Sequence, residues 1–160
     1  MAISNSSAFD EGSKESRDMG ISSSLQRPIK MVFIGAGSGF LYQLFKDALN
    51  LPGVDGEIAL VDIDERRLDL AMRFCQKVNQ VMGRNWKITG NTDRRKVLKG
   101  ANYVVNTVEV SGMMTVKLDN DIPAKYGVSQ SIGDTMGPGG LFKTLRTGPV
   151  LIEIMRDIEK

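Results

Sequence analysis

The stretch Lys30-Met-Val-Phe-Ile-Gly35-Ala-Gly37-Ser-Gly39-Phe40 decides the fold, because a strand-like run passes directly into a glycine turn and a helix-like pattern. A buried parallel strand that feeds the N-terminus of a helix favours binding of a nucleotide pyrophosphate. Glycines let backbone N–H groups approach the phosphates, and the helix dipole favours negative charge. Phe40 replaces the third glycine of the G-x-G-x-x-G pattern, so the spacing alone is weak evidence. The stretch predicts dinucleotide binding, or else a βαβ unit whose glycines only make a tight turn.

A second strand-like run favours the dinucleotide interpretation. The run Glu57-Ile-Ala-Leu-Val-Asp62 ends in a carboxylate about 25 residues after Gly37. A ribose-binding acid is expected at about this distance from the glycine turn. Asp62 is therefore the predicted ribose-binding residue.

Strand-like and helix-like patterns alternate after Pro28, which predicts an α/β fold with a Rossmann-like, doubly wound parallel sheet and right-handed crossovers. Ligands on such sheets bind beyond the carboxyl ends of the strands, where Gly35, Asp62 and Asn106 fall. A complete fold of this kind has two mononucleotide-binding halves, so we expect an incomplete, N-terminal part of the domain. The expected strands are Lys30–Gly35, Glu57–Val61, Trp86–Thr89 and Ala101–Val108, the last nearly unbroken in apolar character as if covered on both faces.

Two helices are predicted from apolar residues at three- and four-residue spacing. Asp64 is the expected N-cap of the second. The first helix, at about 38–50, places Phe40, Leu41, Leu44, Phe45 and Ala48 on one face, and the second carries a stripe of Leu68, Ala71, Met72, Cys75, Val78 and Met82.

Two further segments are predicted after the third strand. Asn91-Thr-Asp93 is expected to cap a helical turn through Leu98, and its run Arg94-Arg-Lys96 is interpreted as a solvated face rather than a phosphate site. A last helix is expected from Leu141 to Ile158.

Composition narrows the function classes. The chain has 160 residues, 41% hydrophobic and 25% charged, which suits one globular domain with a real core. A net charge of +2 is too small to argue for nucleic acid or a membrane, and no apolar run approaches a membrane span. With no histidine and one cysteine, the chain offers no imidazole and no internal disulfide, so we expect no metal site and a reducing cytoplasm.

Residues 1–27 are serine-rich, mix charges of both signs and lack hydrophobic periodicity. Such a composition cannot bury enough surface to offset its ordering entropy, so we expect a disordered leader. The predicted dinucleotide-binding domain covers residues 28–160.

The segment from Val110 to Gly140 has an unusual composition. Four glycines and a proline fall within residues 133–140, which predicts an irregular loop that opens the last helix. Irregular loops at the ligand end of a sheet commonly carry the substrate site. A flexible connector is the alternative.

These residues together resemble family 4 of the glycoside hydrolases, the NAD-dependent glycosidases, in their N-terminal portion. The resemblance runs from Lys30 to the end, and its last two motifs are far more specific than the glycine turn. QSIGDTMGPGG resembles the branch that acts on unphosphorylated galactosides, glucosides or galacturonides. The matching motifs are FIGAGS (33–38), LVDIDERRL (60–68), NTDRR (91–95), YVVNTV (103–108), IPAKYGVSQSIGDTMGPGG (122–140) and LRTGPV (145–150).

The resemblance implies hydrolysis by redox and elimination. NAD would take a hydride from sugar C3, a base would remove the C2 proton, and the C1 substituent would leave. Water would then add and the hydride return. A divalent metal, typically manganese, would polarise the sugar oxygens.

The resemblance also implies roles for particular residues. Asp62 would bind the adenosine ribose and favour NAD over NADP. Asn106 would lie near the nicotinamide half. Asp134 would contact the substrate sugar unless it only caps the next helix, Gln130 is a weaker candidate, and Glu109 is weaker still. The pyrophosphate would be lined by Gly35, Ala36, Gly37 and Ser38.

The departures from the family pattern are large. The family's metal-binding Cys and His and its proton-transfer residues lie downstream of anything in this chain, and Cys75 is in the wrong place. The catalytic residues stay unassigned, and the 160 residues alone are expected to be inactive. In the full-length protein we expect a homo-oligomer.

Two other classes stay open. A lactate/malate-type dehydrogenase shares the nucleotide fold, but needs a downstream histidine and does not explain GDTMGPGG. A non-catalytic dinucleotide-binding remnant would follow if 160 residues were the complete chain.

Overall fold

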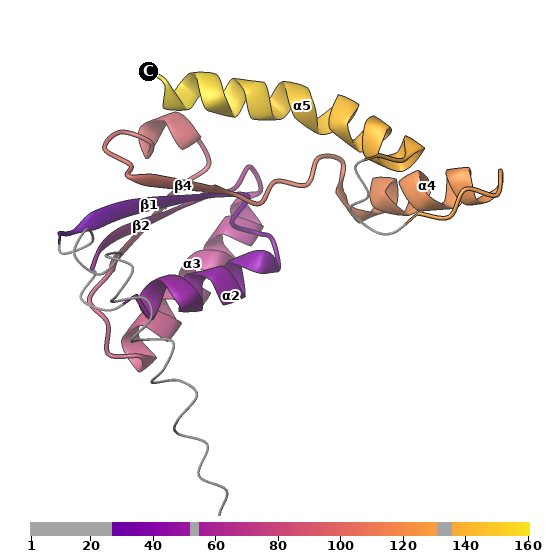
Figure 1. Ribbon diagram of the computed structural model, residues 1–160. Helices are drawn as coiled ribbons and strands as arrows, with labels where there is room; N and C mark the ends of the chain where they lie inside the picture. The colour runs from indigo at the N-terminus through magenta and orange to yellow at the C-terminus, as the bar shows by residue number, and fades with distance from the viewer. Residues whose placement is uncertain (1–26, 52–54, 131–135) are drawn as a thin grey trace, which may run out of the picture.

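The computed structural model describes residues 27–51, 55–130 and 136–160 (Figure 1). Residues 1–26 of the segment 1–27 that was predicted as a disordered leader, and Asp134, lie outside the described residues. The elements are β1 (Ile29–Ile34), α2 (Phe40–Leu49), β2 (Gly56–Val61), α3 (Glu65–Val81), β3 (Lys87–Asn91), the 3-10 turn η2 (Arg94–Lys96), β4 (Tyr103–Asn106), α4 (Gly112–Ala124) and α5 (Pro138–Ile158).

The four strands form one parallel sheet in the order β3-β2-β1-β4, which confirms the Rossmann-like α/β prediction. The register aligns the last residues of all four strands. Ile34 pairs with Val61 and with Asn106, and Val61 pairs with Asn91. The loops that leave the four strands therefore start side by side at one edge of the sheet.

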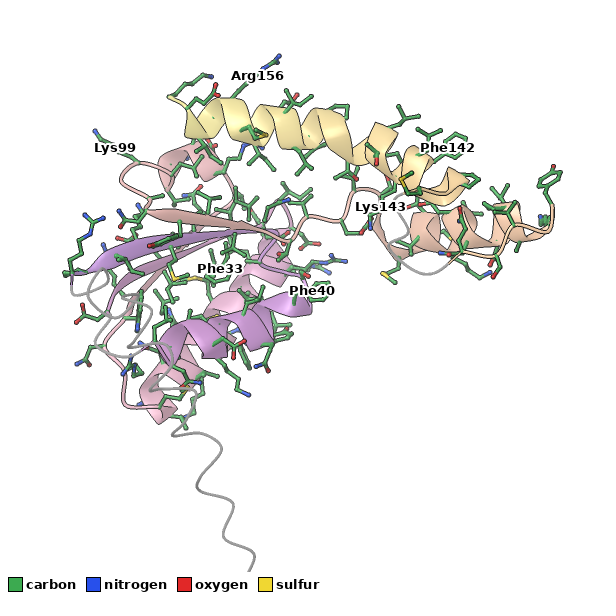
Figure 2. All side chains as sticks on the ribbon, in the orientation of Figure 1. Phe33, Phe40, Lys99, Phe142, Lys143 and Arg156 are labelled. Atoms are coloured by element: carbon green, nitrogen blue, oxygen red, sulfur yellow. The ribbon has the colours of Figure 1, made fainter. Side chains whose placement is uncertain are left out.

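Side chains of the two central strands alternate between two cores, as the two-residue period of a strand requires. Phe33 and Leu60 point into the core under α2 and α3, whereas Val32 and Val61 point into the core on the opposite face. Figures 1 and 2 show α2 and α3 on one side of the sheet and α5 on the other, with Phe33 between the sheet and the first pair. Both central strands are thus covered on both faces.

Helix α3 confirms its prediction closely. Asp64 caps it by accepting hydrogen bonds from the backbone N–H groups of Arg66 and Arg67 at 2.9 and 3.1 Å. Its apolar stripe faces the core as expected: Leu68, Ala71 and Cys75 are buried, and Met72, Val78 and Met82 pack against them.

Helix α2 corrects part of its predicted face. Leu41, Phe45 and Ala48 are buried, but Phe40 is 73% exposed and Leu44 is 37% exposed. The buried stripe also includes Leu49. Each residue turns the helix by about 100°, so the buried residues share a face centred near Phe45. Phe40 and Leu44 lie outside that face.

The prediction for strand β4 is wrong in two respects. It covers four residues, not eight, and Tyr103 and Asn106 at its ends are exposed while Val104 and Val105 are only half-buried. In the described sheet β4 is one of the two edge strands and pairs with β1 alone. Apolar residues therefore do not imply burial on both faces here.

Helix α4 was not predicted from the sequence. Its apolar side chains lie around most of its circumference, and only Pro123 is buried. Among the described elements, the helix packs against α5 and not against the sheet. Arg146 of α5 donates two hydrogen bonds to the Asp119 carboxylate, at 3.0 and 2.5 Å, and this pair joins the two helices.

The turn η2 is capped by Asp93, as predicted. The interpretation of Arg94–Lys96 as a solvated face holds for Arg95 and Lys96, which are exposed, but is wrong for Arg94. Arg94 donates from Nε to Asp157 of α5 at 2.8 Å and is 26% exposed. This pair links η2 to the helix that covers the sheet.

Replacing Phe45 with alanine should lower the free energy of unfolding by about 3–5 kcal/mol, because it removes a fully buried aromatic ring and leaves a cavity. Phe40→Ala, on the same helix, is the matched control and should change it by less than about 0.5 kcal/mol. Guanidinium-induced unfolding measures both. Equal effects would contradict the described orientation of α2.

Asp119→Asn should lower the melting temperature at pH 7 by roughly 2–4 °C. The hydrogen bonds from Arg146 hold the pKa of Asp119 below its ordinary value. The ion pair therefore stabilises the folded state above the unfolded pKa, near 3.9, and this contribution is lost as pH falls through the lower folded value. The difference between wild type and variant should shrink in acid.

Asp121→Asn is the control for that measurement. Asp121 lies on the same helix but is exposed and pairs with Lys117, one turn away. A pH-independent difference between Asp119→Asn and wild type would show that the ion pair is not its cause.

Candidate functional site

The carboxyl edge of the sheet brings together residues from four separate parts of the chain. Gly35, Asp62, Thr92 and Thr107 each follow directly after one of the four aligned strand ends. Three of the predicted site positions, Gly35, Asp62 and Asn106, therefore meet at this edge. This is the edge at which open parallel sheets bind their ligands.

Gly35 begins a turn that only glycine fits well. Its φ is +84°, and a Cβ there would lie 2.9 Å from the backbone C and O of Thr107. The amides of Gly35 and Ala36 both donate to the Val61 carbonyl at 2.9 Å, and the Thr107 hydroxyl donates to the Gly35 carbonyl at 2.9 Å. The turn is thus attached to the strands on both sides of β1.

Asp62 connects the end of β2 to the glycine turn. Its Oδ2 accepts a hydrogen bond from the Gly37 amide at 2.6 Å, and its Oδ1 accepts one from the Asp64 amide at 2.9 Å. A Cβ at Gly37 would lie 2.7 Å from Asp62 Oδ2 and 2.6 Å from Cβ of Arg67. Each carboxylate oxygen has a further lone-pair site, so Asp62 can hold the turn and still accept from a ribose hydroxyl.

The turn ends at the N-terminus of α2 with an open face. The Ser38 hydroxyl accepts from the Phe40 amide at 3.3 Å, and a Cβ at Gly39 would meet no atom within 4 Å. The first turn of this ten-residue helix carries no acidic side chain. The amides of Gly35, Ala36, Gly37 and Ser38 donate within the protein, so what suits a phosphate group here is the N-terminus of α2, whose first turn has no acidic side chain.

The other predicted site residues are placed as follows. Asn106 is exposed at the end of β4, and its side-chain oxygen accepts from the Val108 amide at 3.4 Å. Glu109 forms an ion pair with Lys143 at 2.7 Å. Both lie on the β4 side of the glycine turn.

The Gln130 side chain joins α4 to the start of α5. Its Nε2 donates to the Asp119 carbonyl at 2.9 Å, and its Oε1 accepts from the Gly139 amide at 3.0 Å. The two ends of the amide thus bind α4 and the start of α5. A substrate role for Gln130 stays a prediction, as does that of Asp134.

The residues present do not fit a manganese ion. The sequence has no histidine, and no group of three potential metal-ligating side chains occurs in the part of the chain that the structure describes. Cys75 is buried in the core under α3, and burial raises the pKa of its thiol to about 12. A thiol so far from ionising is a poor metal ligand.

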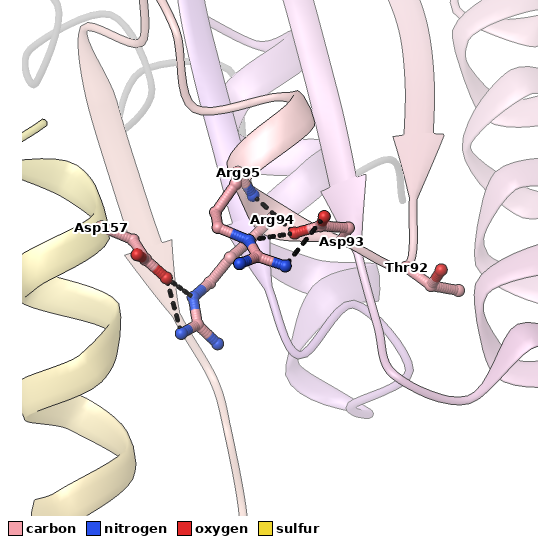
Figure 3. A pocket seen from close by; sticks show the side chains of 5 residues that line it. All are labelled: Thr92, Asp93, Arg94, Arg95 and Asp157. Carbon is pink, nitrogen blue, oxygen red and sulfur yellow. Dashed lines mark hydrogen bonds and ion pairs between the residues drawn. The ribbon is translucent and has the colours of Figure 1, made fainter.

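The sequence interpretation missed a pocket of about 370 Å³ beyond β3, lined by Thr92, Asp93, Arg94, Arg95 and Asp157 (Figure 3). The lining side chains are polar, and Arg95 forms an ion pair with Asp93. It donates from Nε and Nη2 to the two carboxylate oxygens, at 2.9 and 3.1 Å. The sequence offered one signal for this pocket, the polar segment Asn91-Thr-Asp93 directly after a strand. It could not indicate Asp157, which is distant in sequence.

The described geometry fits a dinucleotide. Gly35 and Gly37 are sites where a Cβ would clash, Asp62 lies beside the turn, and the Gly39 side is open. These features agree with a phosphate-binding turn that a neighbouring strand holds in place.

No helix within residues 27–51, 55–130 and 136–160 is long and apolar enough to cross a membrane.

Comparison with known proteins identifies relatives over almost all of the described chain. The model of "Family 4 glycosyl hydrolase" matches residues 30–160. An alpha-galactosidase of Rhizobium meliloti is 38% identical over 133 residues, which cover 82% of this chain and 27% of the relative. A 6-phospho-beta-glucosidase of Escherichia coli is 33% identical over 142 residues, covering 85% of this chain and 31% of the relative.

A solved structure agrees with these matches. The 6-phospho-beta-glucosidase of Thermotoga maritima, determined with NAD and glucose-6-phosphate, superimposes with a TM-score of 0.73 at 25% identity, covering 83% of this chain and 31% of that chain. The chain spans about three tenths of the length of the relatives it matches. From the family match, the relatives and the fold together, the chain belongs to family 4 of the glycosyl hydrolases and corresponds to its NAD-binding region.

Proposed function

We propose that this chain binds NAD as part of a glycosidase that hydrolyses O-glycosyl bonds by a redox and elimination sequence. The observation that carries the proposal is the Gly37–Asp62 hydrogen bond, which presents the glycine turn at the carboxyl edge of the sheet in a family 4 chain. A turn held in this way places the N-terminus of α2 where a diphosphate would bind and a carboxylate where a ribose would bind.

Each residue of the turn has a definite task in this proposal. Gly35 and Ala36 bind the turn to β2, while Ser38 and the open side of Gly39 receive the pyrophosphate. Asp62 binds the adenosine ribose, and Asn106 orients the nicotinamide half from β4. Bound NAD would supply the hydride acceptor for the sugar C3 position.

The substrate assignment rests on the segment from Gln130 to Gly140. Its motif favours an unphosphorylated galactoside, glucoside or galacturonide, with Asp134 at the sugar and Gln130 as a second candidate. Relatives include both alpha-galactosidases and 6-phospho-beta-glucosidases, so the substrate branch is part of the proposal. The bonds of the Gln130 amide give it a structural task in either branch: it joins α4 to the start of α5.

Metal chemistry belongs to residues outside this chain in the proposal. One related structure, again of the Thermotoga maritima 6-phospho-beta-glucosidase, was determined with manganese, NAD+ and glucose-6-phosphate. The present residues do not fit such an ion, so the 160 residues alone are proposed to be inactive. We further propose a homo-oligomeric, cytoplasmic full-length enzyme.

A lactate/malate-type dehydrogenase is the second candidate, and the family match disfavours it. A non-catalytic dinucleotide-binding protein is the third. It would use the same glycine turn and Asp62, so NAD binding alone does not distinguish it from the proposal.

Asp62→Ala should weaken NAD binding about 10- to 100-fold, because it removes a charged acceptor from both the turn and the ribose. It should also reduce the preference for NAD over NADP, since the carboxylate no longer repels a 2′-phosphate. Isothermal titration with both dinucleotides measures these effects.

Asp64→Ala is the matched control for Asp62→Ala. It removes a neighbouring carboxylate that caps α3, so it should cost about 1 kcal/mol of stability and leave the NAD to NADP ratio unchanged. An unchanged NAD affinity in Asp62→Ala would exclude Asp62 from the ribose site.

The full-length protein should release p-nitrophenol from a galactoside, glucoside or galacturonide only when NAD and manganese are both present. It should not reduce NAD with 2-hydroxy acids. Oxidation of a 2-hydroxy acid without glycoside hydrolysis would favour the dehydrogenase. Neither activity, with NAD binding retained, would favour the non-catalytic protein.

A further inference from the structure

Gly35 gives the glycine turn a backbone that rotates easily. Its φ of +84° suits glycine, which is also the residue with the widest choice of backbone conformations. A ligand that needs the turn in one shape binds the fraction of molecules that already have that shape, so its apparent affinity falls with this fraction. Contacts that fix the peptide unit after Gly35 therefore raise the affinity for whatever binds at the turn.

The peptide unit between Gly35 and Ala36 is held at both ends. On its N–H side, the Ala36 amide donates to the Val61 carbonyl of β2 at 2.9 Å. On its C=O side, the Gly35 carbonyl accepts two hydrogen bonds at 2.9 Å, one from the Ser38 amide and one from the Thr107 hydroxyl. The Ser38 bond lies within the turn itself. The Thr107 hydroxyl therefore ties this carbonyl to the chain that leaves β4.

The backbone of Thr107 is fixed against β1. Its amide donates to the Ile34 carbonyl at 2.9 Å, directly after the paired residues of β1 and β4. A Cβ at Gly35 would lie 2.9 Å from the carbonyl carbon and oxygen of Thr107, so the two backbones approach closely. The hydroxyl starts from an ordered, half-buried residue, so its hydrogen bond to the turn costs little additional ordering.

Thr107 and Asp62 hold the turn from opposite sides. Asp62 follows β2 and binds the Gly37 amide, whereas Thr107 follows β4 and binds the Gly35 carbonyl; β2 and β4 are the two neighbours of β1. The Thr107 hydroxyl has one hydrogen and two carbonyls in reach, that of Gly35 at 2.9 Å and that of Ile34 at 3.2 Å. Its hydrogen is used within the protein, so Thr107 acts on a ligand through the turn.

The turn passes this order on to α2. The Ser38 amide binds the Gly35 carbonyl, and the Ser38 carbonyl accepts from the Leu41 amide at 3.1 Å, in the first turn of the helix. Leu41 is buried in the core. A fixed Gly35 carbonyl thus orients Ser38 and the N-terminus of α2, the part of the site that suits a phosphate group.

We propose that Thr107 is a positioning residue for the dinucleotide: its hydroxyl fixes the Gly35 carbonyl and so holds the turn in the shape that receives the diphosphate. This inference rests on the proposed binding of NAD at the glycine turn. Thr107 comes directly after Asn106, so two consecutive residues at the end of β4 serve the two halves of NAD. Asn106 serves the nicotinamide half, and Thr107 serves the diphosphate through the turn.

The test compares Thr107→Val, Thr107→Ser and wild type by calorimetric titration of NAD, using the full-length protein. Valine keeps the branched shape and removes the hydroxyl, so NAD binding should weaken about three- to tenfold, the loss expected for one hydrogen bond. Serine keeps the hydroxyl and should restore most of the affinity. In glycoside hydrolysis, Thr107→Val should raise the KM for NAD by the same factor and leave kcat at saturating NAD unchanged.

Thr144→Val is the matched control. The Thr144 hydroxyl also donates to a glycine carbonyl, that of Gly140 at 2.8 Å, but it lies exposed on α5. Its loss should leave the NAD affinity unchanged. Wild-type affinity in Thr107→Val, an equal loss in Thr144→Val, no recovery in Thr107→Ser, or a lower kcat with an unchanged KM would each overturn the positioning role.

Thr107→Ala gives a second measurement of the same loss, because alanine also lacks the hydroxyl and needs less space beside the turn. A melting temperature well above the titration temperature in each variant excludes unfolding as the cause of a lost affinity.

Failure of this inference is distinguishable from failure of the proposed function. If wild type binds NAD and Thr107→Val binds it equally well, only the role of Thr107 is overturned. If wild type binds no NAD, both are overturned. If wild type binds NAD and hydrolyses no glycoside, the glycosidase proposal fails and calorimetry still decides the role of Thr107.

Discussion

The Asp62–Gly37 hydrogen bond is the interaction on which the site depends. It joins the end of β2 to the turn that leaves β1, and its 2.6 Å length places a carboxylate directly against a glycine amide. Glycine is required there because a Cβ would clash with Asp62 and Arg67. The same contact thus fixes the turn, sets the start of α2 and places the candidate ribose-binding carboxylate beside the glycine turn.

This contact is possible because the sheet places four strand ends in register. The central strands are buried on both faces, so a shift of one residue would exchange their two cores and is strongly disfavoured. The aligned ends then put the glycine turn, Asp62, Thr92 and Asn106 along one edge. In this arrangement the glycine turn and the proposed ribose-binding carboxylate lie at the ends of the neighbouring strands β1 and β2.

The predictable parts are those that short stretches of sequence specify. The N-cap of Asp64, the stripe of Leu68, Ala71 and Cys75, and the strand that leads into Gly35 all came from patterns within a few residues. Periodicity was less exact at the start of α2, where Phe40 and Leu44 lie at the edge of the buried face. An apolar run also misled the description of β4, because the pattern does not say which strand lies at a sheet edge.

By itself, the sequence determined the α/β alternation and the glycine turn, because local hydrogen bonding and hydrophobic periodicity are encoded by neighbouring residues. Its motifs also carried the resemblance to the family. Only the tertiary structure decided that Arg94 binds Asp157, that Asp119 and Gln130 join α4 to α5, and that a pocket forms beyond β3. Arg94 and Asp157 are 63 residues apart. Such contacts depend on how helices pack across the sheet, and no local pattern specifies that packing.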